Sequence, residues 1–194
     1  MSEPFVYVWD KFVRFFHWSL TTVFILLYCS ANYEYDDIHF LLAYLLVLLL
    51  IGRIVWGFIA PRHAHFSNFT YPMSETTFYL KALVNGNTQR YLGHNPAGAL
   101  MIFAFFLLLI LMTVTGFIML TWGEYEGPLW AIGIDFSDIT AKVCRQIHEI
   151  CTNLLLVLIA FHLMGVALSS FKHRENLVSA MWHGKKKNKC KNSA

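Results

Sequence analysis

Four stretches of the chain are long, apolar and almost free of charged side chains. They cover residues 15–33, 38–59, 96–121 and 143–170. A helix needs about 20 residues to cross the roughly 30 Å of hydrocarbon in a bilayer. Because lipid offers no partner to a backbone amide, each stretch is predicted to satisfy its hydrogen bonds as a transmembrane helix. The pattern predicts an all-α integral membrane protein, with residues 1–194 forming a single membrane domain.

The polar segments between these stretches differ in character. A short acidic turn covers residues 32–37, and a longer polar loop covers residues 61–96, with a short interfacial helix expected around residues 74–84. The segment 122–140 is rich in tryptophan, glycine and acidic residues, and a basic tail covers residues 172–194. No cleavage site of the A-x-A kind follows the first apolar stretch, so we expect it to remain as a span.

Composition supports the membrane interpretation. The chain of 194 residues is 57% hydrophobic and only 14% charged, against about 45–50% and 25% in soluble domains. The net charge of +3 does not indicate nucleic-acid binding, because the lysines gather in a tail beside a membrane-length apolar stretch and no nucleic-acid fold signature accompanies them.

The basic residues also predict an orientation. All but two of the 15 lysines and arginines lie at the termini, at Arg53 or in the loop 61–96, and the exceptions are Lys142 and Arg145. The positive-inside rule then places both termini in the cytoplasm and the acidic loops in the periplasm, with the bacterial inner membrane as the location. The tail lysines would face anionic lipid.

The cysteines carry no recognisable cofactor motif. Cys29, Cys144, Cys151 and Cys190 include no C-x-x-C pair, so covalent haem attachment and a zinc knuckle are not indicated. Cys144 and Cys151 are about 10 Å apart along one helix, too far for a disulfide. A bridge from Cys29 to either remains open, and packing as small apolar residues is favoured.

Four of the nine histidines fall within or at the ends of the predicted spans. Ionisable side chains inside a membrane are costly, which makes them functional candidates. His17 lies near the cytoplasmic end of the first span and His39 near the periplasmic end of the second. The fourth span carries His148 near the periplasmic face and His162 deeper, toward the cytoplasm. Each side of the membrane therefore receives two histidines.

The spacing in the fourth span favours haem. His148 and His162 are fourteen residues apart, which places both rings on one helix face with a rise of about 21 Å. One metal ion cannot use both rings, whereas two stacked haems can, each with a second axial imidazole from another helix. We pair His17 with His162 and His39 with His148. A proton relay is a weaker alternative because buried acids are missing along the path, and a zinc or di-iron centre would need ligands in one place.

Short motifs in order along the chain carry a family resemblance. They are Val8-Trp9-Asp10 with Arg14, Phe16-His17-Trp18, Gly52-Arg53-Ile54-Val55-Trp56-Gly57, His63-Ala64-His65-Phe66, Gly93-His94-Asn95-Pro96 with Gly98, His148, His162, and Arg174-Glu175-Asn176-Leu177. In this combination the chain resembles the bacterial cytochrome b-561 family, which also includes the b-type cytochrome subunits of nickel–iron hydrogenases.

The resemblance implies a four-helix bundle with two b haems in its core. It implies His17, His39, His148 and His162 as the axial ligands, the set already reached from depth. The family usually has arginine at the position of His65, so a contact of that arginine with a haem propionate or quinone is in doubt here. The C-terminus is short for a hydrogenase subunit, which favours the stand-alone or cytochrome-partnered branch.

Other polar residues are candidates for supporting roles. Arg14 and Arg53, with Lys11, could bind haem propionates at the cytoplasmic edge, and Arg145 at the periplasmic edge, although each also suits topology anchoring. His94 suits either an interfacial position beside the Pro96 helix start or a contact with quinone or haem.

The expected function is electron transfer through two haems about 20 Å apart. The main hypothesis links the quinone pool to a periplasmic partner such as a c-type cytochrome, which would be attracted by the acidic loops. The alternatives are a membrane-anchor subunit of a hydrogenase or other dehydrogenase, a superoxide oxidase that reduces quinone, and a haem-free transport or interaction protein. Whether the chain is itself an enzyme stays open.

Overall fold

A computed structural model describes residues 5–60 and 62–188. Contacts between Cα atoms divide these residues into two compact units. One comprises the described residues up to Leu100 together with those from Met164 onward, and the other is Met101–Leu163. The expectation of a single membrane domain stays a prediction.

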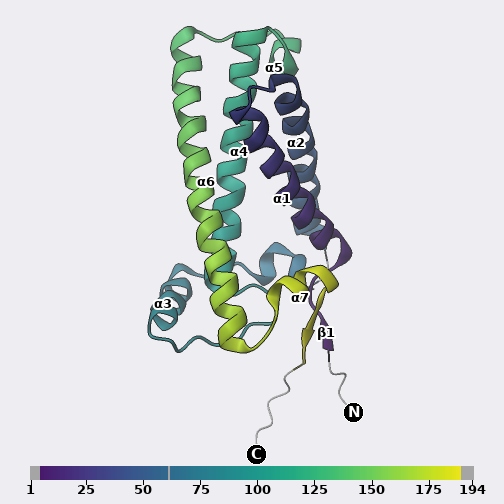
Figure 1. Cartoon of the computed structure of the whole chain (residues 1–194), viewed down its shortest axis with the longest axis vertical. Coiled ribbons are helices and arrows are strands. Elements are labelled where there is room, and N and C mark those ends of the chain that lie inside the picture. The colour runs from purple at the N-terminus through teal and green to yellow at the C-terminus, as the bar shows by residue number, and fades with distance from the viewer. Residues whose placement is uncertain (1–4, 61, 189–194) are drawn as a thin grey trace, which may run out of the picture. The chain divides into compact units, whose positions relative to one another are not determined.

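Four long helices dominate the chain, and their residue ranges confirm the four predicted apolar helices. They are α1 (Lys11–Asn32), α2 (Asp36–Ile59), α4 (Pro96–Glu124) and α6 (Asp138–His173) (Figure 1). Each is long and apolar enough to cross a membrane, so the chain is a multi-pass membrane protein. At 1.5 Å per residue, the 36 residues of α6 span about 54 Å, so α6 extends well beyond the hydrocarbon layer.

The remaining elements are short. They are β1 (Phe5–Tyr7), the 3₁₀ turns η1 (Arg62–Ala64) and η2 (Phe66–Asn68), α3 (Met73–Val84), α5 (Gly127–Ala131), α7 (Leu177–His183) and β2 (Lys185–Lys187). Helix α3 confirms the short helix expected around residues 74–84. Met73, Leu80 and Val84 are exposed on its surface, which suits a helix lying in the membrane interface. That placement stays a prediction.

Helices α1 and α2 pack against each other in the first unit. Their contact buries Val23 and Leu27 of α1 and Leu46 and Leu50 of α2. The outward apolar side chains, such as Leu48, are exposed. This arrangement is expected in lipid, where apolar side chains gain nothing by turning inward.

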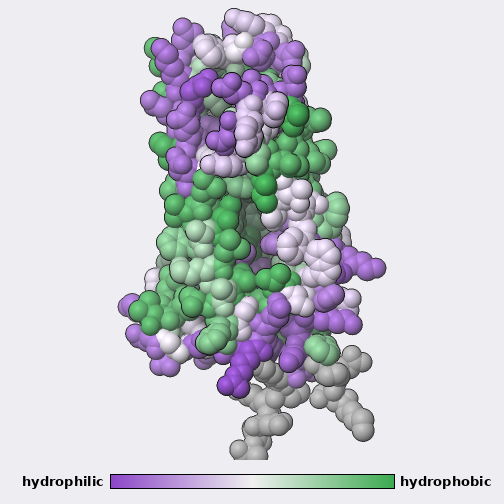
Figure 2. Space-filling view, viewed as in Figure 1, coloured by the Kyte–Doolittle hydropathy of each residue, from purple (hydrophilic) through white to green (hydrophobic). Residues whose placement is uncertain are grey.

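The surface of α6 changes character along its length. Figure 2 shows hydrophilic side chains over its first turns and hydrophobic ones over the turns that follow. The first turns carry Lys142, Arg145 and Glu149, all exposed. The surface of α6 is therefore polar at its start and apolar over the turns that follow.

The two ends of the described chain meet in the first unit. Strand β1 pairs antiparallel with β2, with Phe5 opposite Lys187 and Tyr7 opposite Lys185. The amides of Val8 and Trp9 donate to the carbonyl oxygen of Gly184. A part of the predicted basic tail is thus folded, which the sequence analysis did not predict; Lys189, Cys190 and Lys191 lie outside the described residues.

The cysteines of the described chain are free thiols. Cys144 and Cys151 are buried in α6 and Cys29 is exposed. Cys29 forms no disulfide with Cys144 or Cys151, so the structure excludes the disulfide that the sequence left open for these three residues. Cys144 and Cys151 occupy the packing role favoured from the sequence.

Asp10 joins the start of α1 to the last turns of α2. One carboxylate oxygen accepts the amide of Val13 at 2.8 Å and caps the helix, and the other accepts Trp56 Nε1 at 3.1 Å. Trp56 in turn packs on Phe12 with ring centroids 4.9 Å apart. A single side chain therefore satisfies a helix end and sets the register of α1 against α2.

Replacing Asp10 with alanine is expected to destabilise the protein by about 1–2 kcal/mol, because both the cap and the indole hydrogen bond are lost. Asp10→Asn keeps an oxygen for the cap and should cost about half as much. Thermal unfolding in detergent measures the difference. Asp37→Ala, an exposed acid in the first turn of α2, is the control and should change stability little. Equal losses for Asp10→Ala and Asp37→Ala would contradict the linking role.

Candidate functional site

One continuous helix carries two of the four candidate histidines. His148 and His162 both lie in α6 and both are partly buried. Fourteen residues of unbroken helix separate them by about 21 Å along the axis and leave their side chains on one face. The spacing inferred from the sequence is thus realised by regular backbone.

Helix α4 supplies the surroundings of both rings within the second unit. Thr115 Oγ1 lies 3.0 Å from His148 Nδ1. A Cβ atom at Gly116 would lie 3.5 Å from His148 Cε1, which is ordinary van der Waals contact, so this turn of α4 lies directly beside the imidazole. Phe105 meets His162 edge to face, with ring centroids 6.2 Å apart. Both histidines therefore face the same neighbouring helix.

The first unit holds its two histidines at separate levels as well. His39 of α2 has its Nδ1 3.1 Å from the carbonyl oxygen of Leu27 and 3.2 Å from Ser30 Oγ, both in α1. His17 precedes Leu27 by ten residues of α1, or about 15 Å along the axis. Each unit thus presents its two histidines at two different levels along its helices.

These surroundings fit a planar cofactor that takes an axial imidazole. A metal-bound histidine usually donates its second ring N–H to a carbonyl or other oxygen, as His39 and His148 can do here. In the described part of the chain, no group of three or more histidine, cysteine, aspartate or glutamate side chains could hold a bare metal ion. A porphyrin brings its own equatorial ligands and needs no such group.

The two arginines expected at the cofactor differ in their contacts. Arg53 is 3% exposed, donates Nη2 to the carbonyl oxygen of Ala64 at 3.3 Å and lies 5.1 Å from the centre of the Phe66 ring. Its Nη1 has no hydrogen-bond partner among the described residues. Arg14 instead donates to the carbonyl oxygens of Trp182 and Asp10. Arg53 is better placed to receive an anionic group, whereas Arg14 ties α7 to the start of α1.

His94 lies between two aromatic rings in the first unit. Its ring centroid is 4.6 Å from that of Trp9 and 4.6 Å from that of Phe69. Burial, and then the positive charges of Arg53, Lys186 and His63, lower the pKa of His94 to about 3. The ring is therefore neutral at physiological pH. Its buried Nδ1 has no hydrogen-bond partner among the described residues.

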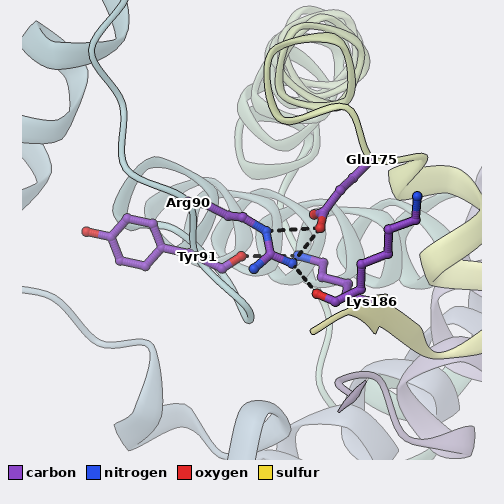
Figure 3. A network of polar contacts seen from close by, with 5 residues as sticks. Arg90, Tyr91, Glu175 and Lys186 are labelled. Atoms are coloured by element: carbon purple, nitrogen blue, oxygen red, sulfur yellow. Dashed lines mark hydrogen bonds and ion pairs between the residues drawn. The ribbon is translucent and has the colours of Figure 1, made fainter. Parts of the chain in front are cut away.

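A polar network holds the loop before α4 to the C-terminal segment (Figure 3). Arg90 donates to the carboxylate of Glu175 through Nε at 3.0 Å and also through Nη2, and to the carbonyl oxygen of Lys187 at 2.7 Å. Lys186 is 7% exposed and directs Nζ to the carbonyl oxygen of Tyr91 at 3.4 Å. The network fixes the segment that leads to His94.

His65, where the resembling family usually has arginine, has a local role. Its Nδ1 accepts the amide of Ser67 at 3.3 Å and lies 2.9 Å from the Ser67 hydroxyl, which caps the turn η2. His65 therefore stabilises the local backbone through its Nδ1.

Comparison with known proteins identifies the family of the chain. The family model described as prokaryotic cytochrome b561 matches residues 8–184. The chain belongs to the prokaryotic cytochrome b561 family. As a b-type cytochrome it is a haem b protein, and the resemblance inferred from the short motifs is confirmed. The candidate ligands, Arg14 and Arg53 all lie inside the matched range.

Several relatives of this b561 family member carry the same description. It is 26% identical over 219 residues to the probable Ni/Fe-hydrogenase B-type cytochrome subunit of Azotobacter chroococcum mcd 1, covering 94% of this chain and 89% of the relative. The subunit of that description from Azotobacter vinelandii is 25% identical, with 94% and 89% covered. That from Rhodobacter capsulatus is 21% identical, with 92% and 80% covered.

The sequence analysis missed the residues that lie against the histidines. Thr115, Gly116 and Ser30 stand in apolar helices, and nothing in their spacing marks them out from ordinary small residues. Hydroxyl groups in apolar helices were the available signal, because such groups are often used between membrane helices. That signal is shared by Thr113 and Thr152, which bond only to their own helix in the contacts described.

The buried side chain of Lys186 predicts that the stability of the protein depends on pH. Burial lowers the pKa of Lys186 from 10.5 to about 8, while Glu175 raises it and Arg90 lowers it further. The unfolded chain keeps this proton to a higher pH than the folded protein does. The free energy of unfolding should therefore rise as pH increases from about 8, by at most about 1.4 kcal/mol per pH unit.

Thermal unfolding of the wild type and Lys186→Met between pH 7.5 and 9.5 tests this dependence. The wild type should gain stability relative to the variant above pH 8, because burying a neutral amine costs less free energy than burying a charged ammonium group. Lys185→Met, at an exposed neighbouring position, is the matched control. A stability difference that stays constant across the range would contradict the assignment.

Proposed function

We propose that the chain is a di-haem membrane cytochrome b that carries electrons between the quinone pool and a hydrogenase-type partner. The observation that carries the proposal is the pair of histidines 14 residues apart in the unbroken helix α6, each with a neighbour from α4. A second pair lies at separate levels of α1 and α2 in the other unit. Two levels of imidazole in each unit match two haems, one toward each face of the membrane.

The proposed axial pairs are His17 with His162 and His39 with His148. A bound haem supplies one-electron exchange between its ferric and ferrous states. The protein's part is to hold the imidazoles of His39 and His148 by their Nδ1 side and to keep water from the site. Arg53 would bind a propionate through its unused Nη1, since a buried guanidinium favours a carboxylate as its partner. Arg14, proposed from the sequence for the same role, has a weaker case because it is already bonded to backbone carbonyls.

The quinone assignment rests on His94 in the first unit. Its Nδ1 is buried and has no hydrogen-bond partner among the described residues. A quinone carbonyl oxygen could accept a hydrogen bond from this nitrogen, and the aromatic rings of Trp9 and Phe69 would suit the flat headgroup. With both termini in the cytoplasm, this end faces the cytoplasmic side of the inner membrane.

A hydrogenase-type partner is favoured over a free-standing c-type cytochrome by the names of the relatives. Six relatives are described as probable Ni/Fe-hydrogenase B-type cytochrome subunits, and the chain spans 89% of the first of them. The short C-terminus therefore does not set the chain apart from such subunits. The acidic side chains Asp36, Asp37, Glu124 and Glu126 are exposed, which would favour a basic docking surface on either partner.

Haem content tests the ligand assignment. Purified protein is expected to contain two haems per chain by the pyridine haemochrome assay with protein quantitation. His39→Ala or His148→Ala should remove one haem, and His17→Ala or His162→Ala the other, because each iron loses an axial ligand. His65→Ala is the control and should retain both. One haem in the wild type, or two after His148 and His162 are replaced together, would overturn the proposal.

Copurification tests the partner. From cells grown under hydrogen with nickel, the tagged chain in mild detergent should bring down a large subunit containing nickel and a subunit containing iron–sulfur clusters. Replacing Asp36 and Asp37 with asparagine should weaken recovery at low salt, if these acids meet a basic surface. Recovery of a c-type cytochrome alone, with salt-sensitive haem oxidation, would instead support the quinol–cytochrome hypothesis.

A further inference from the structure

The hydroxyl of Thr115 determines which nitrogen of His148 carries a proton. Thr115 is 5% exposed, and its Oγ1 lies 2.8 Å from the carbonyl oxygen of Leu111 and 3.1 Å from that of Met112. A hydroxyl has one proton, and both carbonyls, which can only accept, are placed to receive it. Its oxygen can then only accept from His148 Nδ1, 3.0 Å away. Nδ1 of His148 is consequently the protonated nitrogen, and the lone pair resides on Nε2.

The same reasoning holds for His39, with different groups. Its Nδ1 lies 3.1 Å from the carbonyl oxygen of Leu27, which can only accept a hydrogen bond. Ser30 is 4% exposed, and its Oγ donates to the same carbonyl at 3.0 Å while lying 3.2 Å from His39 Nδ1. The Nδ1 proton of His39 is therefore shared between a carbonyl and a hydroxyl of α1. Its lone pair, too, resides on Nε2.

An N–H···O bond at Nδ1 makes the imidazole a stronger electron donor through Nε2. A stronger donor stabilises the ferric state relative to the ferrous state and lowers the reduction potential. We propose that Thr115 on α4 and the Leu27–Ser30 pair on α1 are positioning groups that orient His148 and His39 and lower the potential of the haem these two histidines share. The inference rests on the proposed function, in which both histidines are axial ligands.

The two hydroxyls are expected to contribute unequally. Thr115 is the acceptor identified for His148 Nδ1, whereas His39 keeps the Leu27 carbonyl if Ser30 loses its hydroxyl. Removing the Thr115 hydroxyl should therefore raise the potential more than removing that of Ser30. The second haem, held by His17 and His162, should keep its potential in both variants.

A redox titration of the full-length protein in detergent, followed by haem absorbance, tests the inference. Thr115→Val retains the shape of the side chain without the acceptor. It should shift the reduction equilibrium of one haem threefold to tenfold toward the ferrous state, or about 30–59 mV upward. Thr115→Ser should restore the wild-type potential. Thr113→Val is the matched control, because Thr113 donates to Leu109 within α4 and should leave both potentials unchanged.

The outcome separates this inference from the proposed function. The haem that shifts should be the one lost in His39→Ala, and its ferric low-spin electron paramagnetic resonance signal should change in Thr115→Val but not in Thr113→Val. Two haems with unchanged potentials in Thr115→Val would overturn the inference and leave the proposed function intact. If Thr115→Val loses that haem, Ser30→Ala decides: a smaller upward shift of the same haem supports the inference, and an unchanged potential overturns it.

Discussion

Hydrocarbon offers no hydrogen-bond partner to an imidazole, and this constraint organises the site. A histidine in a membrane helix must direct its N–H at another protein group, or bear the cost of leaving it unsatisfied. His39 does so toward a carbonyl and a hydroxyl of α1, and His148 toward a hydroxyl of α4. The same bonds that remove this cost would leave Nε2 as the ring nitrogen for the proposed haem iron. In each unit, one hydrogen bond at Nδ1 therefore both satisfies the histidine and orients its ring as a possible ligand.

The length and continuity of α6 set the distance between the two levels. An unbroken helix has a fixed rise, so fourteen residues give about 21 Å whatever lies beside it. Proline is absent from its 36 residues, and its glycine, Gly165, follows His162 rather than lying between the histidines. A kink between the two rings would change their relative direction as well as their spacing. The regular backbone of α6 therefore sets the distance between His148 and His162 along the proposed electron path.

The polar end of the first unit shows how buried charge is tolerated outside the lipid. Arg90 and Glu175 form an ion pair next to the buried Lys186, and the β1–β2 pairing brings Lys186 over the ring of Trp9 at 5.6 Å. Trp9 also packs against His94. Burial, together with the positive charges nearby, lowers the pKa of His94 and keeps its imidazole neutral, so that it can form a hydrogen bond with a neutral carbonyl group. The folded tail therefore contributes to the proposed quinone environment, and is more than an electrostatic anchor.

The sequence by itself determined the four helices, the family and the spacing of His148 and His162. Each depends on local quantities, namely the length of an apolar stretch, the order of short motifs and the rise per residue. The tertiary structure decided the contacts of Thr115 and Ser30 with the histidines, the bridge from Asp10 to Trp56, the β1–β2 pairing and the different surroundings of Arg14 and Arg53. Those contacts join residues distant in sequence, and their geometry depends on how whole helices pack. The hydropathy of the sequence indicates which face of a helix prefers lipid. It does not indicate which hydroxyl group will contact which histidine.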